Sequence, residues 1–290
     1  MKLPGNLLPK DVNNLFVAGD IRVNENVFLT TYHTIFVREH NRLCDEIFSD
    51  HPNLVDEQIY QIARHYVIGL LQKITMDEFL PFLLGIEYFT TLGPYTIYNP
   101  SINPNIPTEF STAAYRVGHS LLVDKYPFLS QSGSQVNEFD LTDLFFKPNL
   151  ISDSFMEQAL RGLAKNKMKE KSAKVADSVR NLLVLDPNNS QIKLDLYSMN
   201  IQRGRDHGLP TYNKVRQAYG LSTLTSFSQL VSDPQIAQNL QTAYGNINKL
   251  DLVVGIFAED SVTGGVLGKL GARIVAQTFR NLRNGDRFWY

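Results

Sequence analysis

A helical repeat of apolar side chains near the start of the chain constrains the fold more than any other feature of the sequence. Between residues 29 and 48 the apolar positions recur at steps of three and four, which is typical of an amphipathic helix. This stretch predicts a long buried helix that ends before Pro52, because proline cannot continue the hydrogen-bond ladder. A second stretch of the same period, residues 55–79, is expected to end at Pro81. Strand signals are nearly absent, so the predicted fold class is mainly α.

Composition and charge narrow the class of protein. With 290 residues, of which 43% are hydrophobic, the chain can bury a large core as one large domain or two. The formal net charge of −1 gives no electrostatic reason to expect nucleic acid or an anionic membrane as a partner. No apolar run approaches the roughly 20 residues of a bilayer span, and the N-terminus shows no hydrophobic signal segment. Cys44 is the only cysteine, which excludes an intrachain disulfide, and a buried, inert thiol is expected.

The rest of the chain divides into expected loops and helices. Prolines predict a loop over residues 93–107, and polar residues predict mostly loop over 130–149, with one helix near 141–146. The lysines between residues 165 and 174 are interpreted as a solvated face of a helix over 153–183. Glycines at 264–271 indicate a closely packed loop, since no strand precedes them to form a phosphate cradle. Further helices are expected within residues 189–202, 211–219, 226–241 and 273–283.

The segment TEFSTAAYRVGHSLL, residues 108–122, predicts a helix that bears a candidate metal ligand. Thr108 is expected to cap it, and Arg116 and His119 project from one face. Gly118 leaves room for a broad, flat group against the backbone. Haem would suit this face, with an iron for the histidine and propionates for the arginine. A single histidine on a semi-apolar helix is nevertheless more often a core residue than a ligand. The predicted buried stripe consists of Phe110, Ala113, Ala114, Val117 and Leu121.

Three ordered motifs carry a resemblance to a known family. TAAYRVGHSLL resembles the proximal-histidine helix of the animal-type haem peroxidases, the myeloperoxidase and cyclooxygenase superfamily. FVAGDIRVNENVFLTTYHTIFVREHNRL at residues 16–43 and MNIQRGRDHGLPTYN at residues 199–213 match in the same order. The resemblance runs from about residue 12 to the C-terminus. It implies a single haem peroxidase domain over residues 1–290, with haem b as cofactor and H₂O₂ and a small electron donor, such as a halide or phenol, as substrates.

The resemblance also implies roles for residues around the haem. His119 matches the axial iron ligand, and Asn200 matches the acceptor of the N–H of its other ring nitrogen. Arg116 and Arg203 resemble the arginines that bind the haem propionates. For each arginine the simpler alternative is a structural salt bridge, and for Asn200 it is a turn residue.

On the other side of the haem the resemblance nominates two residues near the start of the chain. Arg22 matches the distal arginine, which stabilises charge on a bound peroxide. Glu25 matches a carboxylate that some members esterify to a haem methyl, although a carboxylate there can equally stay free. Asn26 stands where myeloperoxidase has a methionine bonded to haem, so that link is absent. His40 and His207 belong to the family pattern and are interpreted as structural residues that hydrogen-bond packed segments.

One departure from the family affects the expected activity. No histidine precedes His33, so the family's distal histidine is not found, and neither is the calcium loop that accompanies it in full-length relatives. We therefore expect the C-terminal part of a longer protein, slightly shortened at its end as well, with weak peroxidase activity by itself. A degenerate, non-catalytic binding domain is the alternative. The compartment is not predicted; it would be extracellular or vesicular if an N-terminal segment is missing. The lack of disulfides resembles the microbial or protist members.

A fatty-acid dioxygenase of the same superfamily is a second alternative, because REHNRLCDEIFSDHP also resembles the cyclooxygenases. Those enzymes use a tyrosine three residues before the proximal histidine. Here that position is Arg116, and Tyr115 is displaced by about 100° around a helix. The motif therefore favours a peroxidase.

Overall fold

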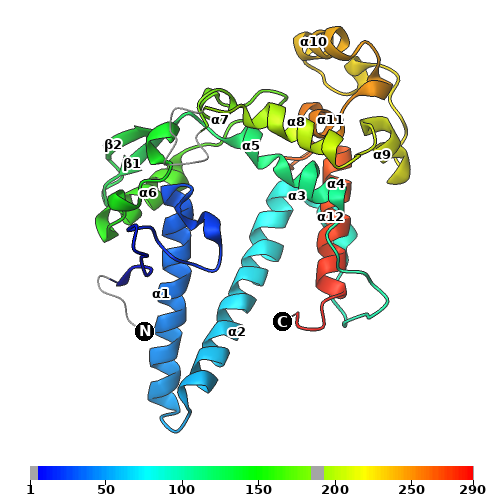
Figure 1. The fold of residues 1–290 in the computed structure, drawn as a ribbon. Coiled ribbons are helices and arrows are strands. Elements are labelled where there is room, and N and C mark those ends of the chain that lie inside the picture. The colour runs from blue at the N-terminus through cyan, green and yellow to red at the C-terminus, as the bar shows by residue number, and fades with distance from the viewer. Residues whose placement is uncertain (1–5, 184–192, 290) are drawn as a thin grey trace. The chain divides into compact units, whose positions relative to one another are not determined.

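The structure, a computed structural model, describes residues 6–183 and 193–289 (Figure 1). Helices dominate the described residues, and the two strands form one short hairpin, so the predicted mainly α class is confirmed. The chain divides into two compact units, which we describe separately. The first contains residues 1–73, 123–167 and 182–193, and the second contains residues 74–122, 168–181 and 194–290. Whether both belong to a single domain stays a prediction.

Two long helices account for much of the first unit. The Asn26 side chain accepts a hydrogen bond from the Leu29 amide and so caps α1 (Val27–Asp50), and α2 (Asp56–Ile74) follows (Figure 1). The predicted helix over residues 29–48 is confirmed. Its predicted burial is wrong, because α1 packs chiefly against the 3₁₀ helix η2 (Ile21–Asn24) and α6 (Asp153–Lys165), which cover only part of it. The fully buried side chains of α1 are Val27, Thr30, Thr31 and Thr34.

A β-hairpin was not predicted, and its second strand lies within residues 130–149, where sequence predicted mostly loop. Strands β1 (Lys125–Leu129) and β2 (Gln135–Asp140) pair antiparallel, with a bulge between Phe128 and Leu129. The helix expected near residues 141–146 is a single 3₁₀ turn, η6 (Leu141–Leu144). Helix α6 packs on β1, and aromatic rings join the hairpin, α1 and α6. These packed rings belong to Phe28, Tyr126, Phe128, Phe139 and Phe155.

Close approach of α6 to β1 makes Gly162 sensitive to substitution. A Cβ at this position would lie 1.8 Å from the Pro127 carbonyl oxygen. That oxygen belongs to the backbone, so the clash is relieved only if α6 and β1 move apart. Gly162→Ala is therefore expected to destabilise the protein by about 1–3 kcal/mol, measured by urea denaturation followed by circular dichroism. The control is Gly69→Ala on α2, where a Cβ meets nothing within 4 Å, and which should gain about 1 kcal/mol of helix propensity. Equal effects of the two variants would contradict the packing argument.

Helix α2 does not end at Pro81, contrary to prediction. A π-helical turn, η3 (Thr75–Phe79), follows α2, and α3 (Leu80–Phe89) then contains Pro81 in its first turn. The backbone stays helical through Phe79 and Leu80, and the π-helical turn lies directly before Pro81, where the regular α-helical bonding is already interrupted. The predicted loop over residues 93–107 is confirmed.

The second unit is built around a buried helix, α11 (Leu252–Ala258), all of whose residues are buried. It contacts α8 (Leu196–Asp206) and α9 (Tyr212–Ala218), while α12 (Lys269–Asn284) packs on α3 (Figure 1). The helices predicted over residues 211–219 and 273–283 correspond to α9 and α12. Within residues 226–241 the chain forms a 3₁₀ turn, η9 (Phe227–Gln229), followed by α10 (Pro234–Tyr244). The helix predicted within residues 189–202 corresponds to α8, although residues 189–192 lie outside the described ranges.

The helix predicted over residues 153–183 is only partly correct. It is divided into α6 and the short α7 (Asp177–Arg180), and the lysine-containing stretch between them is irregular. Within the glycine-containing loop, Gly265 lies against the backbone of Leu84 and Gly85, which confirms close packing. Over the described ranges, no helix combines the length and apolar character that a membrane span would need.

Candidate functional site

The segment over residues 108–122 is not one continuous helix, contrary to prediction. It forms α4 (Thr108–Thr112), a 3₁₀ turn η5 (Ala114–Arg116) and α5 (Gly118–Leu121), with a break at Ala113. Thr108 is the first residue of α4 and does not cap it. Of the predicted stripe, only Leu121 is less than fully buried. Each short piece packs its apolar residue into the core, so the gain from burial outweighs the interrupted backbone hydrogen bonds.

His119 and Asn200 meet as predicted, from α5 and α8. The His119 Nδ1 atom lies 3.2 Å from Asn200 Oδ1. The Asn200 amide nitrogen donates to the Leu196 carbonyl one turn earlier, which assigns the amide oxygen to the histidine side. Nδ1 therefore carries the proton and donates, and Nε2 carries the lone pair. Among the described residues, Nε2 has no hydrogen-bond partner. It is free to coordinate a metal.

The surroundings of His119 keep the imidazole neutral. Burial lowers its pKa from the ordinary value of 6.5, the nearby Arg116 guanidinium lowers it further, and the hydrogen bond to Asn200 opposes both. A metal binds neutral imidazole, so the protonation state suits a ligand.

The Arg116 guanidinium lies close to this histidine, and Arg203 lies close enough to Arg116 for their charges to interact. Arg116 donates through Nε to the Ser111 carbonyl at 3.2 Å and through Nη1 to Asn200 Oδ1 at 3.4 Å. Burial lowers the pKa of Arg116, and the positive charge of Arg203 lowers it further. Over residues 6–183 and 193–289, neither arginine forms a salt bridge with a carboxylate. The simpler alternative, a structural salt bridge, is therefore not realised for either arginine in these ranges, and both can bind an anion.

These residues fit haem. A Cβ built on Gly118 meets nothing within 4 Å, so open space borders the backbone next to His119, as predicted. The described residues contain no cluster of three or more His, Cys, Asp or Glu side chains able to hold a metal ion. A porphyrin needs only one protein ligand for its iron, and two unpaired arginines suit its carboxylates. His119, Asn200, Arg116 and Arg203 would hold the group.

Arg22 and Glu25 belong to the first unit, and their predicted position beside the haem stays a prediction. The exposed Arg22 guanidinium forms a bidentate ion pair with Asp20, at 2.9 Å and 2.7 Å. Glu25 accepts a hydrogen bond from the Asn26 amide. Burial raises the pKa of the Glu25 carboxyl, and the hydrogen bond from the Asn26 side chain and the charge of Arg22 oppose this shift. Among the described residues this partly buried carboxyl forms no salt bridge with an arginine, so it remains available for another group.

His40 and His207 take part in local hydrogen bonds. His40 on α1 lies 3.3 Å from the Tyr60 carbonyl oxygen of α2, which agrees with its predicted role between packed segments. His207 Nδ1 lies 3.0 Å from the Arg203 carbonyl oxygen at the end of α8. Cys44 is half-buried and not fully buried as predicted, and burial raises the pKa of its thiol, which disfavours the reactive thiolate.

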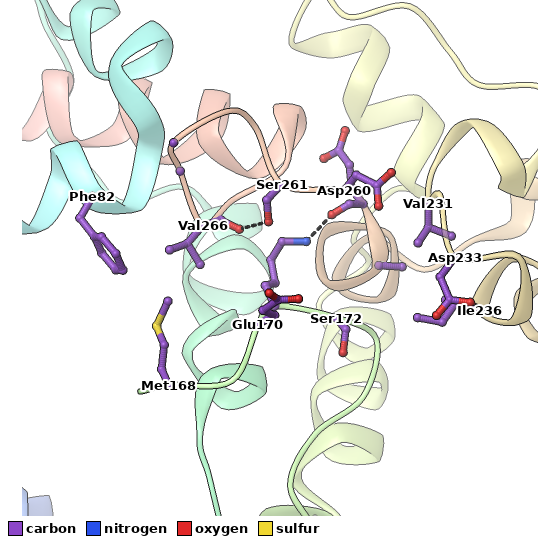
Figure 2. Close-up of a pocket in the computed structure, with 15 residues that line it drawn as sticks. Phe82, Met168, Glu170, Ser172, Val231, Asp233, Ile236, Asp260, Ser261 and Val266 are labelled. Atoms are coloured by element: carbon purple, nitrogen blue, oxygen red, sulfur yellow. Dashed lines mark hydrogen bonds between the residues drawn. The ribbon is translucent and has the colours of Figure 1, made fainter. Parts of the chain in front are cut away.

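Sequence reasoning missed the role of Lys171. Instead of lying on a solvated helical face, it donates to the carbonyls of Phe257, at 3.1 Å, and Glu259, at the C-terminal end of α11. Lys171 lines a cavity of about 600 Å³, and Glu170, Asp233 and Asp260 also line it (Figure 2). No sequence signal separates this lysine from its neighbours in the run. The cavity is separate from the histidine site, since none of the four proposed haem-binding residues of the second unit lines it.

Comparison with known proteins decides the family. The family model described as animal haem peroxidase matches residues 4–290. The chain belongs to the animal haem peroxidase family. It is 36% identical over 285 residues to peroxinectin A of Dictyostelium discoideum, covering 98% of this chain and 52% of that protein. It is 38% identical over 285 residues to mouse (Mus musculus) lactoperoxidase, covering 95% of this chain and 40% of that protein. The predicted family resemblance is confirmed.

Solved structures show the same peroxidase fold. Peroxidase A from Dictyostelium discoideum superposes with a TM-score of 0.89 at 36% identity, over 98% of this chain and 55% of that chain. A fatty acid alpha-dioxygenase from Oryza sativa superposes with a TM-score of 0.84 at 21% identity, over 98% of this chain and 53% of that chain, a likeness of fold alone. The chain thus spans about half the length of the Dictyostelium relatives.

Proposed function

We propose that this chain supplies the proximal, histidine-bearing side of a haem b site in a peroxidase that uses H₂O₂ to oxidise small donors such as halides or phenols. The observation that supports this most is the geometry of His119, whose Nδ1 bonds to Asn200 and whose Nε2 has no partner among the described residues. When bound, haem would supply the iron redox chemistry that links peroxide to donor.

Asn200 sets how strongly His119 donates to a metal. Its amide oxygen accepts the Nδ1 proton and fixes the ring, which keeps Nε2 as the coordinating atom. An amide oxygen carries less negative charge than a carboxylate, so its hydrogen bond raises the electron density of the imidazole less. His119 is therefore a weaker donor to a metal than it would be beside a carboxylate. Arg116 and Arg203 would bind the propionates as forked donors and so fix the orientation of the macrocycle.

The distal side of the proposal rests on the family resemblance. Arg22 would stabilise negative charge on the peroxide while the O–O bond is cleaved. Glu25 would lie against the haem edge, either esterified or as a free carboxyl. The family's distal histidine and calcium loop are not found in this sequence. Turnover by the chain alone is therefore expected to be low, since one acid–base residue contributes about 10²- to 10⁴-fold.

Contacts of the residues before His119 favour a peroxidase over a dioxygenase. The ring of Tyr115 stacks on Phe110 with centroids 4.6 Å apart and lies 5.9 Å from Phe279, so it is held in an aromatic cluster. The residue three positions before the histidine, Arg116, shares the Asn200 oxygen with it.

Loading the purified chain with haemin tests the proposal. We expect a one-to-one complex with a Soret band and H₂O₂-dependent oxidation of guaiacol. Asn200→Asp should lower the midpoint potential of the bound iron, because a carboxylate makes His119 a stronger donor. The matched control, Gln202→Glu, adds the same charge at an exposed position of α8 and should shift the potential less. Equal shifts would remove Asn200 from its proposed role, and robust oxygen uptake with linoleate would favour the dioxygenase.

A further inference from the structure

A small pocket in the second unit lies between the chain that follows α9 and the exposed face of α12. Its volume is about 360 Å³, near the lower end of the usual range for small-molecule sites. Tyr219 and Gly220 line it together with Arg273, Gln277 and Arg280 of α12. Among the described residues, no carboxylate lines this pocket, and none of the four proposed haem-binding residues of the second unit does. The pocket is therefore separate from the histidine site.

The carbonyl groups of the last turn of α9 are already bonded. The carbonyls of Val215, Arg216 and Gln217 accept from the amides of Tyr219, Leu221 and Gly220. The Tyr219 carbonyl in turn accepts from Arg273 Nε at 3.2 Å. Unbonded carbonyls at a helix end carry partial negative charge, so these bonds weaken a repulsion that an anion in the pocket would otherwise meet.

The Arg273 guanidinium is held in place and keeps unbonded donors. Its Nε atom donates to Tyr219, and its Nη2 atom lies 3.7 Å from the position that a Cβ on Gly220 would take. Gly220 has a φ of +72°, a left-handed conformation that favours glycine, so the chain turns close to the guanidinium. In the part of the chain that the structure describes, neither Nη group forms a hydrogen bond or a salt bridge. Both groups therefore remain for an oxyanion.

Positive charge continues along the same face of α12. Gln277 and Arg280 follow at steps of four and three residues, and over residues 6–183 and 193–289 neither side chain forms a hydrogen bond or a salt bridge. Burial lowers the pKa of Arg283, and the charge of Arg280 lowers it further. Between Asp260 and Asp286 the sequence contains no acidic residue that could compensate these charges. The surface beside the pocket is therefore left with net positive charge.

The spacing of the two arginines sets what kind of anion fits. Arg273 and Arg280 are seven residues apart, a rise of about 10 Å along a helix, so each fork can bind an oxyanion group of its own. From the unpaired arginines, the absence of a carboxylate among the described lining residues and the small volume, we infer that this pocket binds a diphosphate, either free or as part of a larger molecule. One phosphate group accepts from Arg273, the other accepts from Arg280, and the Gln277 amide donates to the oxygens between them. This pocket is additional to the proposed haem site and does not depend on it.

Isothermal titration calorimetry of the haem-free chain with inorganic diphosphate, in metal-free buffer, tests the inference. At low salt we expect one-to-one binding with a dissociation constant of about 0.3 mM, the strength of a few exposed charge-assisted hydrogen bonds. Orthophosphate has a single group and should bind about tenfold more weakly, since only one fork is then used. ADP carries the diphosphate on a nucleoside and should bind within about threefold of free diphosphate. Added salt should weaken all three.

Substitutions on α12 locate the binding site. Arg273→Gln and Arg280→Gln should each weaken diphosphate binding about tenfold, because each removes one forked donor. Arg280→Lys keeps the charge without the fork and should weaken binding about threefold. The matched control, Lys269→Gln, removes a positive charge from the same exposed face outside the pocket and should change the dissociation constant less than about twofold. All of these side chains are exposed, and circular dichroism checks that the variants fold.

Three results would overturn the inference. The first is no saturable binding at about 10 mM diphosphate. The second is equal affinity for diphosphate and orthophosphate, or binding of ADP alone, because the recognised group would then not be the diphosphate. The third is equal weakening by Lys269→Gln and Arg273→Gln, because general positive charge and not the forked donors would then hold the anion.

Discussion

Replacing His119 by alanine is expected to weaken haemin binding more than about 100-fold and to abolish the Soret band of the loaded chain. Loss of an outer partner of a metal ligand already costs about 10–100-fold, so loss of the ligand itself should cost more. In the structure, no other described His, Cys, Asp or Glu side chains cluster where they could replace it. Absorption titration with haemin gives both the affinity and the spectrum.

Two further variants make this prediction specific. His51→Ala removes an exposed imidazole from the turn after α1 and should retain the spectrum and affinity of the unaltered chain. His119→Gly leaves space for a free ligand, and added imidazole should restore the Soret band. An unchanged spectrum in His119→Ala would remove His119 from the axial position. Loss of haem without rescue by imidazole would show that the substitution acts through the fold.

Sequence predicted the meeting of His119 with Asn200 because both residues lie in motifs that the family resemblance places at one site. It also predicted the buried stripe around them, since spacing reports which side chains share a face. It did not predict that the segment breaks at Ala113. Spacing alone does not show whether a core is filled better by one helix or by three short pieces, because that depends on distant packing partners.

The wrong predictions for the hairpin, for the burial of α1 and for Lys171 also arise because the outcome depends on packing partners that are distant in the sequence. In β1 a proline interrupts the alternation, and every residue of β2 is at least partly exposed, so neither strand shows the period of two that indicates a half-buried strand. An apolar stripe showed that α1 is amphipathic, but it could not show how much of that face its partners cover. Lys171 was assigned to solvent with its neighbours, because a lysine that bonds to helix-end carbonyls has the same sequence signal as an exposed one.

Arg216→Met is expected to destabilise the second unit by about 3–5 kcal/mol, the usual cost of breaking a buried ion pair. Arg216 Nη1 lies 2.7 Å from Glu259 Oε1, and each side chain is only 7% exposed. The pair joins α9 to the end of α11, and α11 in turn contacts α8 and η5, which carry Asn200 and Arg116. Without the guanidinium, a buried carboxylate loses its closest positive charge. Urea denaturation followed by circular dichroism measures the loss.

The pH dependence of this loss identifies its cause. Burial already raises the pKa of Glu259, while the Leu270 amide, Tyr212 and Arg216 oppose the shift, so removal of Arg216 should raise it further. The folded variant then binds more protons than the unfolded chain above the ordinary carboxyl pKa of 4.5, and its stability should fall as pH rises from about 5 to 8.

Controls separate the buried charge from simple loss of contacts. Arg216→Met/Glu259→Met removes both members of the pair and should recover part of the stability with little pH dependence, because neither a buried carboxylate nor a buried guanidinium is then left without its partner; Lys171 keeps Asp260 as a nearby negative charge. Arg205→Met breaks the more exposed pair with Asp251 in the same unit and should cost less, since water solvates the remaining carboxylate. If Arg216→Met loses the same stability at pH 5 and pH 8, the loss comes from packing and not from the Glu259 carboxylate.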